Sequence, residues 1–188
     1  MALSENPAER HRQVAGHFGA VAGGVTDWEA SSPVPDWRAR DVVAHLVDWF
    51  PGFLSGGGVT LAPVSVSVAD DPAAVWTAHA AAVQELFDDG EREFVHPMVG
   101  THRLTDAIDQ FYTSDIFMHT WDLAKAADVE PGLDPDFAGA LLAGMQPIDE
   151  MLRASGQYGP KVPVASDAPV VDQLMAFVGR NPGWTPAR

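Results

Sequence analysis

Apolar positions recur at helical spacing along most of the chain. In the first stretch, five of them follow one another at steps of four, three, four and three: Val14, Phe18, Val21, Val25 and Trp28. Such steps place apolar side chains on one face of an α-helix. Pro7 suits the first helical position and Asn6 suits the cap, so the pattern predicts an amphipathic helix from about residue 7 to 28.

Further helices are predicted in the same way. They cover about residues 37–51, 71–90, 105–128, 134–154 and 169–178. Asp36, Asp71 and Asp134 precede three of them as expected N-caps, and Gly90 and Gly179 follow two of them as expected terminators.

The connections between these helices are rich in turn residues. EASSPVPD (29–36) and EREFVHPMVGTHR (91–103) predict irregular loops, and Pro51 is expected to end or kink the second helix. SGGGVTLAPVSVSVADD (55–71) predicts a long loop, mobile or lid-like. No strand pattern is strong. We therefore expect an all-α fold over residues 1–188 as a single domain, with four long helices in a bundle, an extra C-terminal helix and a loop-rich tail.

Composition excludes several classes of function. The chain has 188 residues with a net charge of −15, which argues against binding to nucleic acid or to an anionic membrane. It has no cysteine, hence no disulfide, thiolate metal site or cysteine nucleophile. It has no signal peptide and no run near the roughly 18 apolar residues of a membrane span, so we expect a cytoplasmic protein. Scarce lysine and abundant Ala, Gly, Pro, Trp and Asp are typical of GC-rich, actinobacterial-type genomes.

The predicted helix over 105–128 has polar groups on its apolar face. Six residues share that face at 100° per residue: Leu104, Ile108, Phe111, Asp115, His119 and Asp122. Asp115 and His119 are four residues apart, so their Cβ atoms are about 6 Å apart and both side chains can reach one ion. A buried carboxylate is costly unless it is paired or metal-bound. The pattern indicates either a metal site or a metal-free, structural Asp–His pair.

A third ligand is expected from a neighbouring helix, and His45 and His79 are the candidates. Periodicity alone favours His79 slightly, because it lies at the centre of its helix's apolar face. Asp122 could orient a ligand from behind or be a buried carboxylate bonded to the backbone or to a nearby Trp. Two tryptophans are interpreted as core or pocket wall: Trp37 and Trp121. The remaining histidines are interpreted as solvated or loop residues: His11, His17, His96 and His102.

Three segments resemble the mycothiol-dependent maleylpyruvate isomerase-like proteins of the DinB/YfiT-like superfamily. In VTDWEASSPVPDWRARDVVAHLVDW the matching residues are Trp28, Pro33, Pro35, Trp37, Arg40, Asp41 and His45. The second segment has an acidic residue four positions before a histidine and then a WDLA run, matched by Asp115, His119, Trp121, Asp122, Leu123 and Ala124. The third segment is the tail, with YGPKVPVASDAP and LMAFVGRNPGW. The resemblance covers most of the chain.

The resemblance implies a DinB-like four-helix bundle with a divalent metal held by His45, Asp115 and His119. Zinc is the leading candidate, and nickel, manganese and iron are compatible. It also implies a low-molecular-weight thiol such as mycothiol, a small-molecule substrate, and a thiol-dependent transferase or isomerase. The alternative is a non-catalytic, stress-related protein of the same fold that binds a metal or ligand.

Two departures from the family separate the metal site from the isomerisation. The isomerase has a second, α/β domain that these 188 residues do not include, and it has Glu where this chain has Asp115. The metal site therefore transfers better than the reaction does. Monomer and homodimer are both compatible with the sequence.

Overall fold

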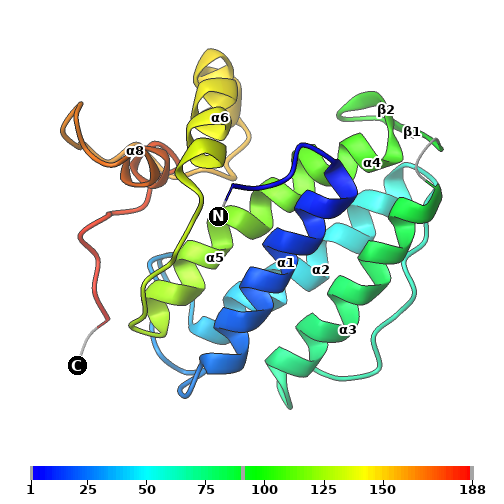
Figure 1. Ribbon diagram of the computed structural model, residues 1–188, viewed down its shortest axis with the longest axis horizontal. Helices are drawn as coiled ribbons and strands as arrows, with labels where there is room; N and C mark the ends of the chain where they lie inside the picture. The colour runs from blue at the N-terminus through cyan, green and yellow to red at the C-terminus, as the bar shows by residue number, and fades with distance from the viewer. Residues whose placement is uncertain (1, 90–91, 187–188) are drawn as a thin grey trace.

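The computed structural model describes residues 2–89 and 92–186 and shows a mostly helical protein (Figure 1). The longer helices are α1 (Pro7–Gly24), α2 (Ala39–Gly56), α3 (Pro72–Glu85), α5 (Ser114–Ala126), α6 (Pro135–Met145) and α8 (Val170–Phe177). The shorter elements are η1 (Leu86–Asp89), β1 (Glu93–His96), β2 (Gly100–Arg103), α4 (Leu104–Ala107), η2 (Ile108–Thr113), η3 (Gln146–Ile148) and α7 (Asp149–Ala154). The prediction of a mainly helical fold is confirmed. Within the described residues, no helix is both long and apolar enough to cross a membrane.

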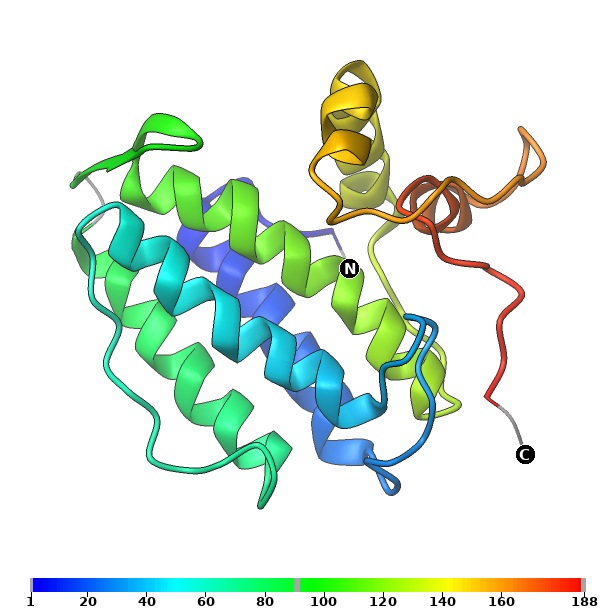
Figure 2. The same ribbon diagram turned by 180° about the vertical axis from the view of Figure 1, so that it is seen from behind.

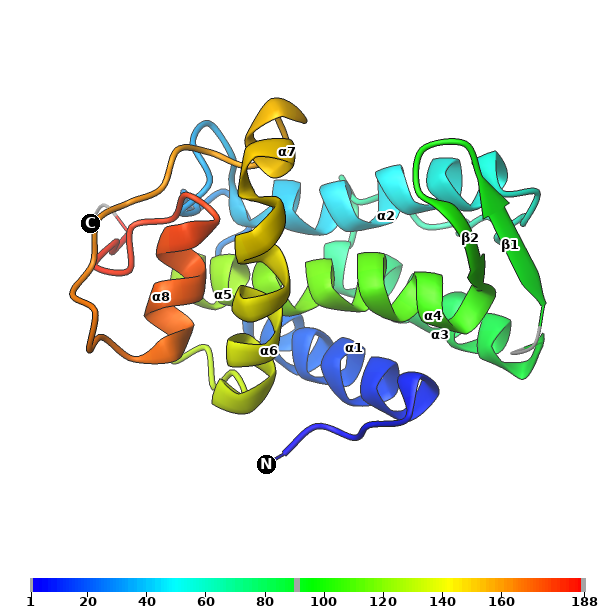
Figure 3. The ribbon, with the colours of Figure 1, turned by 90° about the horizontal axis from the view of Figure 1, so that it is seen from above.

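The long helices lie side by side and bury their apolar stripes between them. α1 packs on α3 and α5, and α2 packs on the same two helices (Figure 2). Fully buried side chains such as Phe18, Leu46, Trp76 and Ile116 fill the space between them, each contributing about 1.5–3 kcal/mol by leaving water. Seen from above, the β1–β2 hairpin lies at one end and α6, α7 and α8 lie at the other (Figure 3).

The predicted start signals of three helices are confirmed. The side chains of Asn6, Asp71 and Asp134 each accept a hydrogen bond from an amide of the first turn, at 3.1, 3.0 and 2.8 Å. Such a cap is worth about 1 kcal/mol. Gly179 follows α8 with φ of 95°, as expected of a terminator. The other expected terminator, Gly90, lies outside the described residues.

The second helix begins later than predicted, and Asp36 is not its cap. Asp36 has φ of 64° and belongs to the turn before the helix. The helix starts at Ala39, and the Asp41 carboxylate accepts a hydrogen bond from the Arg38 amide at 2.8 Å. The first turn of α2 is therefore capped by the side chain of Asp41, which lies inside the helix and bonds back to the Arg38 amide.

Three other helix boundaries differ from the prediction. The first helix ends at Gly24 rather than near residue 28, because Val25 is extended. Pro51 lies inside α2, which continues to Gly56. The predicted helix over 134–154 is instead divided, because η3, which contains Pro147, separates α6 from α7.

The segment 91–103, predicted as an irregular loop, contains an antiparallel β-hairpin. Phe94 pairs with His102, and His96 pairs with Gly100. Along β1, buried Phe94 and His96 alternate with exposed residues, which is the period of a strand. The prediction of no strand, and of a solvated His96, was wrong because four residues give too short a pattern to stand out.

The glycine run at the end of α2 lets this hairpin pack closely on the helix. A Cβ atom on Gly57 would overlap the Phe94 ring, and one on Gly56 would overlap His96. Beyond the glycines, Val59 and Leu61 are buried, so the start of the long loop is anchored to the core. The glycines therefore serve close packing here.

The predicted helix over 105–128 is continuous but changes its winding. α4 and α5 are joined by η2, a π-helical segment with wider turns. Three residues at a spacing of four along η2 and the start of α5 are all buried: Ile108, Tyr112 and Ile116. Phe111, expected on the buried face, is only partly buried.

Two histidines are buried in the core. His11, interpreted from the sequence as solvated, is fully buried on α1, with Nδ1 2.9 Å from the Thr113 hydroxyl. His79 on α3 is 2% exposed, and its ring lies edge-on to Tyr112. Position 11 precedes Val14 by three and Phe18 by seven residues, so the helical period already placed it on the apolar face.

We expect these two histidines to make the fold sensitive to acid. Burial lowers the pKa of His11 to about 3 and of His79 to about 4, whereas both protonate near 6.5 when unfolded. The part of the free energy of unfolding that depends on their neutral form is fully present above about pH 6.5 and is lost as the pH falls toward about 3. In urea unfolding between about pH 7 and pH 4.5, His79→Phe should lose less stability than the wild type, by up to about 1.4 kcal/mol per pH unit. Equal losses in both proteins would contradict this, and His102→Phe is the matched control.

The packing of the hairpin can be tested with alanine. Gly57→Ala should lower the free energy of unfolding by about 1–3 kcal/mol, because the added methyl displaces the Phe94 ring. Gly16→Ala on α1, where nothing lies within 4 Å of a new Cβ, should instead raise it by up to about 1 kcal/mol. Denaturant unfolding of both variants measures the difference. An unchanged free energy of unfolding in Gly57→Ala would show that the hairpin can move away from the added methyl at no cost.

Candidate metal centre

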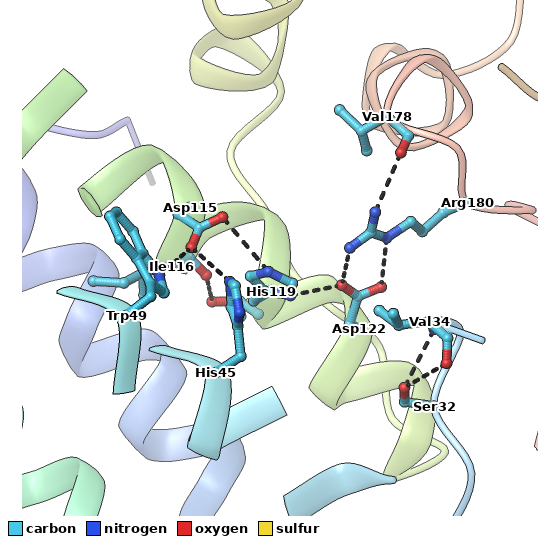
Figure 4. A network of polar contacts seen from close by, with 11 residues as sticks. Ser32, Val34, His45, Trp49, Asp115, Ile116, His119, Asp122, Val178 and Arg180 are labelled. Atoms are coloured by element: carbon cyan, nitrogen blue, oxygen red, sulfur yellow. Dashed lines mark hydrogen bonds and ion pairs between the residues drawn. The ribbon is translucent and has the colours of Figure 1, made fainter. Parts of the chain in front are cut away.

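Three side chains with metal-binding chemistry meet where α2 packs on α5. His45 comes from α2, and Asp115 and His119 come from α5 (Figure 4). His45 Nε2 is 3.2 Å from Asp115 Oδ2, and His119 Nε2 is 3.5 Å from Asp115 Oδ1. One ligand atom from each residue lies within 4.8 Å of the other two. We call these three residues the triad.

The local helix geometry explains why the triad forms. Asp115 and His119 are one turn apart on the regular part of α5, so their side chains point to the same side. On α2, His45 and Trp49 are likewise one turn apart, beside the fully buried stripe that includes Leu46 and faces the core. Packing of α2 on α5 therefore brings the two pairs together.

Asp115 is held as a carboxylate. Burial by itself would raise the pKa of Asp115, but the charge of His119, the hydrogen bond with His45 and the indole of Trp49 outweigh it, so the pKa is lowered. Trp49 Nε1 donates to Asp115 Oδ2 at 3.0 Å. An anionic oxygen is thus available to a cation at ordinary pH.

His119 is oriented from behind by a second carboxylate. Its Nδ1 is 2.9 Å from Asp122 Oδ2, and Asp122 is completely buried. Because an ionised carboxylate only accepts hydrogen bonds, Nδ1 carries a proton, and the opposite nitrogen, Nε2, points toward Asp115. This is the arrangement in which histidine ligands are held in metalloproteins.

Arg180, from the turn after α8, keeps Asp122 ionised. Its Nε and Nη2 are 3.2 and 3.0 Å from the two Asp122 oxygens (Figure 4). Burial would raise the pKa of Asp122, but the charge of Arg180 and the hydrogen bond with His119 lower it overall. A series of hydrogen bonds therefore leads from Arg180 in the tail through Asp122 to His119 in the triad.

Aromatic rings enclose one side of the triad, and His45 opens the other. Trp37 stacks on His119 with centroids 5.7 Å apart, and its centroid lies 5.0 Å from that of His45. The His45 side chain is 32% exposed, against 6% for His119. Of these two ligands, His45 is therefore the one that solvent reaches more readily.

Two of the residues singled out in the sequence lie away from the triad. Trp121 is in the core, with the Lys125 ammonium 5.4 Å from its ring centroid. His79 contacts Tyr112, which in turn contacts Trp49, so it stands two rings behind Asp115. Periodicity favoured His79 as third ligand, and the structure brings His45 to that position instead.

Sequence reasoning missed two residues that support the triad. Trp49 was interpreted only as part of an apolar face, although its place one turn after His45 puts the indole beside the same carboxylate. Arg180 gave no local signal, because it is 58 residues from Asp122 along the chain.

The donor set fits a divalent metal ion. Two imidazole nitrogens and one carboxylate suit zinc, nickel, iron or manganese and leave coordination positions for other ligands. His119 Nε2 and Asp115 Oδ1 face one another at 3.5 Å, so that one cation could bind both. His45, partly in water, can move its proton to Nδ1 and free Nε2.

Comparison with known proteins finds similarity over nearly the whole chain. Two uncharacterized proteins of Mycobacterium tuberculosis, MT0763 and Rv0738, are each 27% identical over 192 residues, covering 94% of this chain and 98% of the relative. No family model matches the chain, and no solved structure matches it. The chemistry of the site therefore rests on its own geometry.

Proposed function

We propose that the protein binds one divalent metal ion through His45, Asp115 and His119. The observation that carries the proposal is the convergence of two imidazoles and an ionised carboxylate, with ligand atoms within 4.8 Å of one another. The alternative of a structural Asp–His pair accounts for Asp115 and His119 but not for the third donor, since His45 from α2 lies 3.2 Å from the same carboxylate. Zinc is the leading candidate, with nickel, manganese and iron also compatible.

We further propose a DinB-like four-helix bundle for the helices that hold this site. The support is that α1 and α2 each pack on α3 and α5, together with the sequence resemblance in the three segments named above. The extra helix α8 and the tail lie outside these four and supply Arg180.

The proposed activity is that of a thiol-dependent transferase or isomerase acting on a small molecule. A divalent metal at this site would lower the pKa of a bound thiol and favour the thiolate. The chain has no cysteine, so the thiol would come from a low-molecular-weight compound such as mycothiol. His45 leaves the entrance open, and Trp37 provides an apolar wall for the carbon skeleton of the bound molecule.

One observation favours a non-catalytic metal- or ligand-binding protein of the same fold as the second candidate. The titratable groups named at the site are the three proposed ligands and two supports, Asp122 and Arg180, that are bonded behind one of them. Each of these five groups would bind the metal or orient a ligand, which leaves none of the five free for proton transfer. Thiol binding separates the two candidates.

Metal analysis tests the site directly. Protein purified without a histidine tag should contain near one metal ion per chain, and both His45→Ala and His119→Ala should lose it, since each removes a nitrogen ligand. His102→Ala, whose imidazole bonds to the Val99 carbonyl instead, is the control and should keep the metal. A wild type without metal, even after incubation with zinc, nickel and manganese, would refute the proposal.

Cobalt substitution tests thiol binding. If the proposed enzyme is correct, adding mycothiol or another small thiol to the cobalt-loaded protein should shift its d–d absorption and add a sulfur-to-cobalt charge-transfer band. A spectrum that no cellular thiol changes would favour the non-catalytic alternative.

A further inference from the structure

We infer that Arg180 is a positioning residue that couples the C-terminal tail to the metal centre. The inference rests on the proposed metal binding and adds a residue and a form of control that the proposal does not contain. Its basis is an unbroken series of hydrogen bonds from the turn after α8, through Asp122, to His119.

Arg180 is fixed in place by its own segment as well as by Asp122. Its Nη1 donates to the Val178 carbonyl at 3.2 Å, and its backbone amide donates to the Met175 carbonyl at 2.8 Å. Two further nitrogens hold Asp122 at both oxygens, the planar geometry in which arginine binds a carboxylate most firmly. The position of the tail therefore sets the position of the Asp122 carboxylate.

The position of Asp122 in turn sets the direction of His119. With its carboxylate held, Asp122 accepts from Nδ1 and aims the opposite nitrogen at the triad. His119 also lies between two carboxylates, Asp115 and Asp122, and Arg180 balances the charge of the deeper one. Without Arg180, Asp122 would be a completely buried carboxylate free to turn, and the imidazole would lose its fixed direction.

A second arginine anchors the same tail without contacting Asp122. Arg153 on α7 donates to the Phe177 carbonyl at 2.7 Å and to Asp149 at 3.1 Å, and it also bonds to the Gly159 carbonyl. Loss of either arginine loosens the tail, but only the loss of Arg180 reaches His119 through Asp122. This pair separates a positioning effect from a general effect on folding.

Zinc affinity, measured by competition with a chromogenic chelator, tests the inference. Arg180→Gln should weaken zinc binding about 10–100-fold, the usual effect of removing a group that orients a metal ligand. Arg180→Lys should recover part of that loss, and Arg153→Gln should stay within about threefold of the wild type. An unchanged affinity in Arg180→Gln, or an equal loss in Arg153→Gln, would overturn the inference.

A spectroscopic readout follows His119 itself and does not depend on affinity. Nitrogen-15 NMR of the metal-free protein should show His119 with its proton on Nδ1. In Arg180→Gln the signals of the two ring nitrogens should show that the proton is no longer held on Nδ1 alone. In Arg153→Gln both signals should stay unchanged. A His119 signal that is the same in all three proteins would count against the inference.

Reciprocity gives a test on the unmodified protein, which avoids any variant that fails to fold. If the tail favours zinc, zinc must favour the docked tail by the same factor. Zinc should therefore slow hydrogen exchange of the Val162 and Arg180 amides, which bond to Ala176 and Met175. A protein that binds zinc without this slowing would refute the coupling and leave the metal site intact. A wild type that binds none of zinc, nickel and manganese would refute the metal site itself.

Discussion

The seam between α2 and α5 is the contact on which the site depends. Apolar residues such as Leu46 and Ile116 hold the two helices together, and beside them Asp115 is placed in a position that water reaches only in part. A carboxylate there must be compensated. His45, Trp49 and His119 provide that compensation, so the same contact that closes the core also gathers the ligand atoms.

The sequence predicted the start of a helix well wherever an apolar stripe and a side-chain cap occurred together. Asn6, Asp71 and Asp134 are local signals that need no knowledge of the rest of the fold. Asp36 misled because a left-handed turn and a cap favour the same residue types. The β1–β2 hairpin was not predicted. Its buried residues, Phe94 and His96, pack against a glycine run at the end of α2, and a pattern within the hairpin's own sequence does not show this contact.

The residues of the candidate site also divide into those that local sequence patterns predict and those that depend on tertiary packing. Asp115 and His119 could be found from their spacing, since both lie on one helix. The choice between His45 and His79 needed the packing of α2 on α5, which spacing does not contain, and only the family resemblance pointed to His45. Arg180 depends on how the tail folds back over α5, and residues joined across 58 positions leave no periodic trace.

The π-helical turn of η2 divides one long helix into two parts of different phase. The part before it, with Leu104, is fitted to the hairpin end, and the part after it is fitted to α2. A helix of uniform winding would tie the direction of Asp115 to the packing of the hairpin, so that neither could be adjusted alone. The extra width of one turn adds a fixed offset between the two parts, so that one part meets the hairpin while the other presents Asp115 to α2.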